Sequence, residues 1–185
     1  GQRWGNPIYD WDYLKENGYQ FWVDRIGYSS RLFDIIRIDH FRAFDTFWKI
    51  PATCPTAIEG EWIEAPGYEV IDTLLEKIPE VNLVAEDLGD LRPEVLELKE
   101  HYHFKGMKIL VFSIDTSGKY AKDIFHDVKN MIIYTGTHDN DTLMEWYDAL
   151  SVAAKRKVRR FLAREGIRQG SVKDRLLAYT WKSKA

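Results

Sequence analysis

The sequence lacks cysteine pairs and long apolar runs. Cys54 is the only cysteine among 185 residues, so an intrachain disulfide is excluded. A chain without disulfides is expected in a reducing compartment, and we place it in the cytoplasm. The longest apolar runs, such as residues 109–112, are far too short to cross a membrane. No signal peptide is recognisable at the start, and we expect no membrane partner.

Positive charge and phosphate-binding loops are scarce as well. Lys and Arg number 26 against 29 Asp and Glu, and no basic stripe marks a nucleic-acid surface. No glycine-rich loop follows a predicted strand, which weighs against a nucleotide-binding sheet. His101 and His103 suggest a metal pair, but no third ligand has suitable spacing, so a solvated helix end is favoured. We expect no metal, no cofactor and no nucleic-acid partner.

What the sequence does contain is a regular alternation of helical and apolar segments. Hydrophobic residues make up 45% and charged residues 30%, which is typical of a soluble globular domain. Strands are predicted at 35–39, 82–89, 107–112 and 131–137. Helices are predicted at 10–32, at 70–78, from Pro93, at 141–150, at 153–164 and from Ser171. The first is expected to break near Asn17-Gly18, and in the last Asp174 completes a capping box with Ser171. The connection 41–67 is long enough to require a function or structure of its own.

This alternation predicts a single α/β domain, residues 1–185, with a parallel sheet that is either open or closed as a barrel. Charged residues stand at the carboxyl ends of the predicted strands: Asp39, Glu86 and the pair His138-Asp139. Active sites of (β/α)8 barrels lie at that face and take residues from several strand ends. The sequence therefore favours a barrel with three carboxylates at one rim.

Three such carboxylates suit the hydrolysis or transfer of glycosidic bonds. Arg37 and Asp39 lie two residues apart on one strand, so their side chains share a face, and Arg37 would keep Asp39 ionised. A buried ion pair in a core is the alternative. The apolar residues before Glu86 would favour its protonated form, as a general acid requires, whereas Asp87 should point to the other face. We expect the carboxyl groups of Asp39 and Glu86 to lie about 5–5.5 Å apart, as in retaining enzymes.

Six motifs, in chain order, resemble those of the 4-α-glucanotransferases (amylomaltases or disproportionating enzymes) of glycoside hydrolase family 77. They are Gly1-Gln2-x-Trp4-Gly5-Asn6-Pro7-x-Tyr9, Arg37-Ile38-Asp39-His40-Phe41-Arg42, Glu59-Gly60-x-Trp62 with Pro66-Gly67, Ala85-Glu86-Asp87-Leu88-Gly89, Gly106-Met107-Lys108, and Thr135-Gly136-Thr137-His138-Asp139-Asn140. One departure is visible, since Ala43 stands where the family commonly has glycine.

The resemblance implies retaining transfer of α-1,4-glucan segments between maltodextrins, as in starch and glycogen metabolism, through a glucosyl-enzyme intermediate. It implies Asp39 as the nucleophile, Glu86 as the general acid/base and Asp139 as the acid that stabilises the transition state. The remaining implied substrate-binding residues are Arg37, His138 and Asn140 as direct sugar contacts, and Trp4 and Phe112 as aromatic contacts. Most of the seven Trp residues are expected in the core, with Trp4 and Trp62 as the reasonable sugar platforms.

The chain resembles the middle of the family's barrel, strands four to seven with their helices. Three strands would precede it and one would follow, so we expect the 185 residues either to self-associate or to belong to a longer chain. Activity of the isolated chain should then be very low. Two other functions stay open: an amylase-like hydrolase with the same three acids, and an inactive glucan-binding or structural piece.

Overall fold

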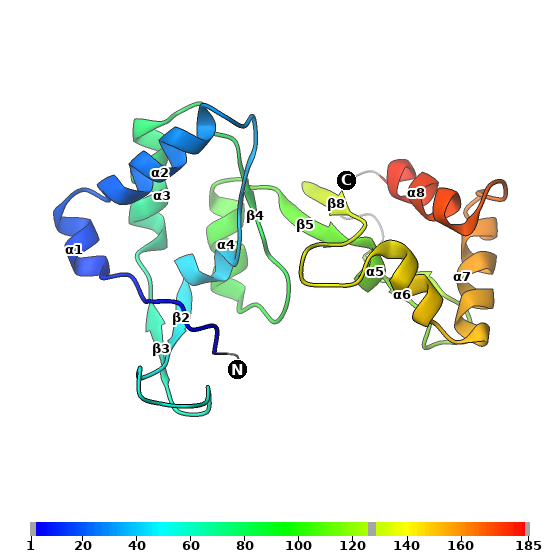
Figure 1. The fold of residues 1–185 in the computed structure, drawn as a ribbon. Coiled ribbons are helices and arrows are strands. Elements are labelled where there is room, and N and C mark those ends of the chain that lie inside the picture. Colours follow the sequence, from blue (N-terminus) through cyan, green and yellow to red (C-terminus); the bar gives the residue numbers. More distant parts are fainter. Residues whose placement is uncertain (1–2, 126–128, 184–185) are drawn as a thin grey trace. The chain divides into compact units, whose positions relative to one another are not determined.

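A computed structural model describes residues 3–125 and 129–183 of the chain (Figure 1). Gly1 and Gln2, which begin the first motif, lie outside the described residues. The chain divides into two compact units, Gly1–Lys105 and Gly106–Ala185. Within the described residues, no helix is both long and apolar enough to span a membrane.

The first unit contains five helices and four strands among its described residues. In chain order they are α1 (Trp11–Glu16), α2 (Gln20–Ser30), β1 (Ile36–Ile38), the 3-10 helix η1 (Phe41–Phe44), β2 (Thr46–Lys49), β3 (Glu61–Glu64), α3 (Gly67–Lys77), β4 (Leu83–Ala85) and α4 (Pro93–His101). The predicted break between α1 and α2 is confirmed, because Gly18 and Tyr19 both adopt left-handed backbone conformations there. Pro93 opens α4 as predicted, since the first turn needs no backbone donor at that position.

Strands β1 and β4 form the parallel pair at the centre of this unit. Their register joins Ile36 to Leu83 and Ile38 to Ala85, and Lys105 adds a parallel bridge to Val84. Helices α2, α3 and α4 supply buried apolar side chains around this pair, including Ile26, Ile71, Leu74, Val95 and Leu98. Strand β4 is thus buried along its length, as a continuous apolar strand predicts, whereas Ile36 and Arg37 of β1 are only partly buried.

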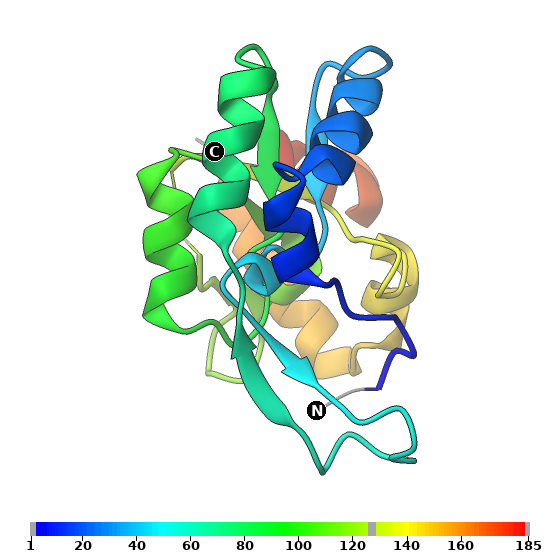
Figure 2. The ribbon, with the colours of Figure 1, turned by 90° about the vertical axis from the view of Figure 1, so that its left-hand side faces the viewer.

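The long connection between β1 and α3 has its own structure. After η1, strands β2 and β3 pair antiparallel with Trp48 opposite Trp62, and Figure 2 shows this ribbon extending away from the helices of its unit. The chain then returns so closely to η1 that a Cβ on Gly67 would collide with the carbonyl oxygen of Phe44. The ribbon therefore leaves and re-enters the unit next to the residues that follow β1.

The second unit contains a second parallel pair followed by helices. Its elements are β5 (Gly106–Ile109), α5 (Leu110–Ser113), β6 (Ile114–Asp115), β7 (Lys122–Asp123), β8 (Met131–Tyr134), α6 (Leu143–Ala149), α7 (Val152–Arg164) and α8 (Val172–Lys182). Strands β5 and β8 pair in parallel from Gly106 opposite Met131 to Ile109 opposite Tyr134. The predicted capping box of Ser171 with Asp174 is confirmed at the start of α8.

The strand predicted over 107–112 is only partly correct. Pairing stops at Ile109, where its partner β8 also ends, and the chain turns into α5. The hydroxyl of Ser113 donates to the carbonyl of Leu110 within that turn, 3.0 Å away. A short apolar run fits a buried helical turn as well as a strand, so its pattern could not separate the two.

Candidate active site

The two acids of the first unit are placed side by side by strand register. Asp39 directly follows Ile38, and Glu86 directly follows Ala85, the residue paired with Ile38. The backbone N–H of Glu86 donates to the Ile38 carbonyl at 2.9 Å, which extends the ladder by one more bond. Both carboxylates therefore stand at the carboxyl edge of the β1–β4 pair, where the sequence predicted them.

Asp39 forms an ion pair with Arg37 and remains accessible. The Nη1 atom of Arg37 lies 2.7 Å from Oδ1 of Asp39, and their side chains are 26% and 61% exposed. The predicted common face of these two residues is confirmed. The alternative of a core ion pair does not fit this unit, because the Asp39 carboxylate is exposed and available to a ligand.

Both oxygens of Glu86 accept backbone hydrogen bonds. The N–H of His40 donates to Oε2 at 2.8 Å, and the N–H of Leu88 donates to Oε1 at 3.0 Å. His40 presents its N–H in this direction because its backbone is left-handed, with φ of 49°. The sequence predicted apolar surroundings for Glu86, whereas the structure supplies two backbone donors that fix the orientation of the carboxyl group.

Asp87 is not a rival for the role of Glu86. Its carboxylate lies 2.8 Å from Nζ of Lys99, with side-chain exposures of 3% and 9%. This buried ion pair turns Asp87 toward α4 and away from the edge at which Asp39 stands, as the alternation along the strand predicted.

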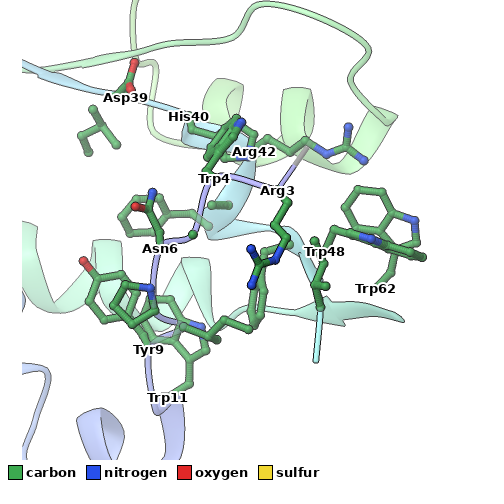
Figure 3. Close-up of a pocket in the computed structure, with 18 of the residues that line it drawn as sticks. Arg3, Trp4, Asn6, Tyr9, Trp11, Asp39, His40, Arg42, Trp48 and Trp62 are labelled. Carbon is green, nitrogen blue, oxygen red and sulfur yellow. The ribbon is translucent and has the colours of Figure 1, made fainter. Parts of the chain in front are cut away.

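An open groove of about 1830 Å³ runs past Asp39 in the first unit. Trp4 lines it beside His40, with ring centres 4.8 Å apart and in edge-to-face geometry. Figure 3 shows Asp39 and Trp62 at opposite ends of this groove. Trp62 carries the Arg42 guanidinium 4.4 Å from its ring centre, and the residue is 54% exposed. Exposed aromatic rings of this kind can stack on the apolar faces of sugars.

His40 has an environment that disfavours its charged form. Burial lowers the pKa of its imidazole below 6.5, and the nearby Arg42 acts in the same direction. The carboxylates of Glu86 and Asp39 oppose this effect only in part. The sequence does not predict the backbone contact of His40 with Glu86, because a left-handed conformation has no reliable sequence signal outside glycine.

The third predicted acid lies in the second unit, on a loop after β8. Asp139 and its neighbour His138 have side chains 76% and 64% exposed, with Nε2 and Oδ1 3.4 Å apart. Asn140 shapes the loop: its Oδ1 accepts from the N–H and the hydroxyl of Thr137, both at 2.9 Å. A Cβ on Gly136 would lie 2.7 Å from Nδ2 of Asn140, so any larger residue here would displace the Asn140 amide.

The two predicted aromatic contacts, Trp4 and Phe112, are both exposed. Phe112 lies on α5 and is 54% exposed, and Trp4 is 58% exposed in the N-terminal loop. The structure therefore joins Trp4, Arg37, Asp39 and Glu86 in one unit, and Phe112, His138, Asp139 and Asn140 belong to the other. Across residues 3–125 and 129–183, no group of three His, Cys, Asp or Glu side chains could hold a metal ion.

Comparisons with known proteins agree with these motifs. A family model described as 4-alpha-glucanotransferase, glycoside hydrolase family 77, matches residues 1–185. A 4-alpha-glucanotransferase of Thermus thermophilus is 44% identical over 90% of this chain and 34% of its own length. One from Streptococcus pneumoniae is 46% identical over 80% of this chain and 29% of its own length.

A solved structure extends the likeness to the fold. An amylomaltase from Streptococcus agalactiae in complex with acarbose superposes with a TM-score of 0.86 and 36% identity, over 99% of this chain and 37% of that one. The chain thus spans about a third of the length of the relatives it matches.

Proposed function

Because the chain belongs to the 4-alpha-glucanotransferases of glycoside hydrolase family 77, we propose that it carries the nucleophile and the general acid of an enzyme that transfers α-1,4-glucan segments. The observation that supports this most directly is the register of β1 and β4, which sets Asp39 and Glu86 side by side. An accessible carboxylate held by Arg37 and a second carboxyl group beside it are what a retaining mechanism needs.

In the proposed reaction, Asp39 attacks the anomeric carbon while Glu86 donates a proton to the departing glycosidic oxygen. The carbon–oxygen bond breaks, the shortened glucan leaves, and a glucosyl ester forms on Asp39. A hydroxyl group of an acceptor glucan then loses its proton to Glu86 and attacks the same carbon, which releases the Asp39 carboxylate. Two inversions give net retention. Arg37 stabilises the ionised Asp39 before attack and after release.

Asp139 and the sugar contacts complete the proposal. Asp139 would stabilise the positive charge that develops on the sugar ring, with His138, Asn140 and Arg37 binding hydroxyl groups. Trp4 and Phe112 are exposed enough to stack on glucose units. The substrate is proposed to be a maltooligosaccharide or a longer α-glucan, in keeping with the acarbose found in the streptococcal amylomaltase.

We further propose that β1, β4, β5 and β8 are strands four to seven of a (β/α)8 barrel and that residues 1–185 form one catalytic-barrel piece. Two parallel pairs and the bridge from Val84 to Lys105 support this assignment. The proposed activity is that of a protein with the relatives' full length. For the 185 residues alone, light scattering should report self-association, and a maltotriose assay should give very low turnover; a monodisperse, fully active monomer would refute this.

The test is a hybrid enzyme in which this sequence replaces the matching segment of the Thermus thermophilus relative. With maltotriose, the hybrid should produce glucose together with longer maltodextrins, without a net increase in reducing ends. A steady increase in reducing ends would favour the amylase-like hydrolase instead. Binding of maltodextrins without any turnover, in a hybrid that folds, would favour the inactive glucan-binding alternative.

A further inference from the structure

In the first unit, the segments that follow Asp39 and Glu86 contact each other at their start and at their end. Asp45 and Arg92 each stand six residues after an acid, namely after Asp39 and Glu86. They form a two-pronged ion pair, with Arg92 Nε 2.6 Å from Asp45 Oδ2 and Nη2 2.8 Å from Oδ1. The Asp45 side chain is only 11% exposed. Such paired hydrogen bonds fix orientation as well as distance.

Three further hydrogen bonds join the same two segments, residues 40–45 and 86–92. The Arg42 guanidinium donates to the Asp90 carbonyl at 2.7 Å. The N–H of Phe41 donates to the Glu86 carbonyl at 3.2 Å, and the N–H of His40 donates to the Glu86 carboxylate at 2.8 Å. The contacts therefore form a ladder that begins at the proposed acid and ends at the ion pair.

Both members of the ion pair are anchored beyond the ladder. The carbonyl of Asp45 accepts from the N–H of Ala65 at 2.8 Å, which fixes it to the end of the β2–β3 ribbon. Arg92 is the residue that caps the start of α4. The ion pair therefore closes a loop, residues 86–92, that supplies the Leu88 N–H to the Glu86 carboxyl group.

We propose that Asp45 and Arg92 are positioning residues for the proposed acid Glu86, an inference that rests on the proposed function. Without their ion pair, the loop loses its far anchor, and Leu88 no longer aims its N–H at Glu86. Asp39 is unaffected, because Arg37 holds it within the β1 segment itself. Loss of the pair should therefore impair proton transfer to the leaving group and spare nucleophilic attack. A misplacement of about 1 Å can lower a rate by roughly 100-fold.

The test compares Arg92→Met and Arg92→Lys in the hybrid enzyme with two donors. Maltotriose needs a proton on its leaving oxygen, whereas the fluoride of α-maltosyl fluoride leaves without one. With maltotriose, kcat should fall about 10–100-fold at nearly unchanged KM. The initial burst of fluoride release should stay within about 3-fold of the parent. Lys49→Met is the matched control, because it removes the exposed ribbon pair with Glu61 and touches neither loop; it should leave both donors unaffected.

A double variant separates positioning from general weakening of the fold. In a Glu86→Gln background, Arg92→Met should cause no further loss with maltotriose, because the group that it positions is already gone. Equal losses with both donors, or a further loss in that background, would overturn the inference. If Arg92→Met fails to fold, Arg92→Lys and Asp45→Asn replace it. For these variants too, the loss with maltotriose is compared with the loss with α-maltosyl fluoride. If Glu86→Gln itself gives no difference between donors, the assignment of Glu86 fails first, and the inference fails with it.

Discussion

The two units carry their proposed catalytic acids in different ways. In the first unit, Asp39 and Glu86 follow paired strand residues directly, and their neighbours are tied across the two segments by backbone and side-chain bonds. In the second unit, Asp139 lies five residues after the end of β8, on a loop held by contacts between Thr137 and Asn140. Its carboxylate is also the more exposed, at 76% against 61% for Asp39.

This difference suggests different demands on the acids. A nucleophile and a proton donor must stay in register with each other, and adjacent strands provide this directly. An acid that stabilises charge can act from a self-contained loop, provided that the loop keeps its shape.

Asp39→Asn should have the largest effect. An amide cannot form the glycosyl ester, so transfer by the hybrid enzyme should fall by about 10⁴-fold or more with the fold intact. The matched control is Asp34→Asn, an exposed carboxylate just before β1, which should retain full activity. Disproportionation of maltotriose measures both. Near-parental activity of Asp39→Asn would exclude Asp39 as the nucleophile.

Lys108→Met should have the next largest effect, on stability rather than on chemistry. Lys108 Nζ lies 2.7 Å from Asp123 Oδ2, with both side chains 3% exposed. Removing the lysine leaves a buried carboxylate without its cation, which costs about 3–5 kcal/mol of the free energy of unfolding. Urea unfolding of the hybrid measures this. Lys49→Met, which breaks an exposed pair, should cost less than about 1 kcal/mol, and a similar cost for both would refute the argument.

Because of the Asp123 carboxylate, we expect the protein to lose stability in acid. Burial alone would raise the pKa of Asp123, but hydrogen bonds from Lys108, Tyr179 and the Phe125 N–H together lower it below 3.8. Because the pKa of Asp123 is lower in the folded state than in the unfolded chain, its ionised carboxylate adds to the free energy of unfolding. This contribution is complete above the unfolded pKa of about 3.9 and is lost as the pH falls through the folded pKa. Unfolding between pH 5 and pH 2 should show this loss in the parent, and Asp123→Asn should lessen the slope.

The sequence was sufficient to predict that Asp39 and Glu86 follow neighbouring parallel strands. Apolar runs ending in Asp39 and Glu86 predicted parallel strands with adjacent acids, because parallel pairing brings carboxyl ends to one edge. Arg37 and Asp39 were correctly assigned to one face, because side chains alternate strictly along a strand. These features depend on short-range patterns.

What the sequence did not predict depends on contacts between distant residues or on backbone angles. The pair of Asp45 with Arg92 joins positions 47 apart, and nothing in either local pattern indicates the other. The helix at Leu110 was missed because buried helices and strands share apolar runs. The left-handed backbone of His40, which gives Glu86 a donor, follows from tertiary packing rather than from residue type.

Asn140→Ala should have a smaller effect than the changes to the acids, and it tests whether the loop of the second unit is self-contained. The substitution removes the acceptor for the Thr137 N–H and hydroxyl, and with it the turn that carries His138 and Asp139. A lost hydrogen bond of this kind is worth about 1–2 kcal/mol, or roughly 5–30-fold in kcat/KM. Thermal unfolding should change little, because the loop is exposed. A loss as large as that of Asp39→Asn would show that Asn140 takes part in the chemistry directly.

The smallest expected effect is a shift in the pKa of His40. Its titration reports on the neighbouring carboxylates of Asp39 and Glu86 without changing them. Burial lowers the pKa of its imidazole, Arg42 lowers it further, and Glu86 and Asp39 raise it in part. The ring should therefore titrate below 6.5 in the folded hybrid enzyme, as NMR of labelled histidine measures, with the signal assigned by its absence in His40→Gln. Because the unfolded chain binds this proton more readily, the folded state loses stability as the pH falls below about 6.5. Glu86→Gln removes a carboxylate that favours the charged ring, so it should move the midpoint to a still lower pH. A midpoint above 6.5, or one that Glu86→Gln leaves in place, would show that His40 is not held against the Glu86 carboxylate.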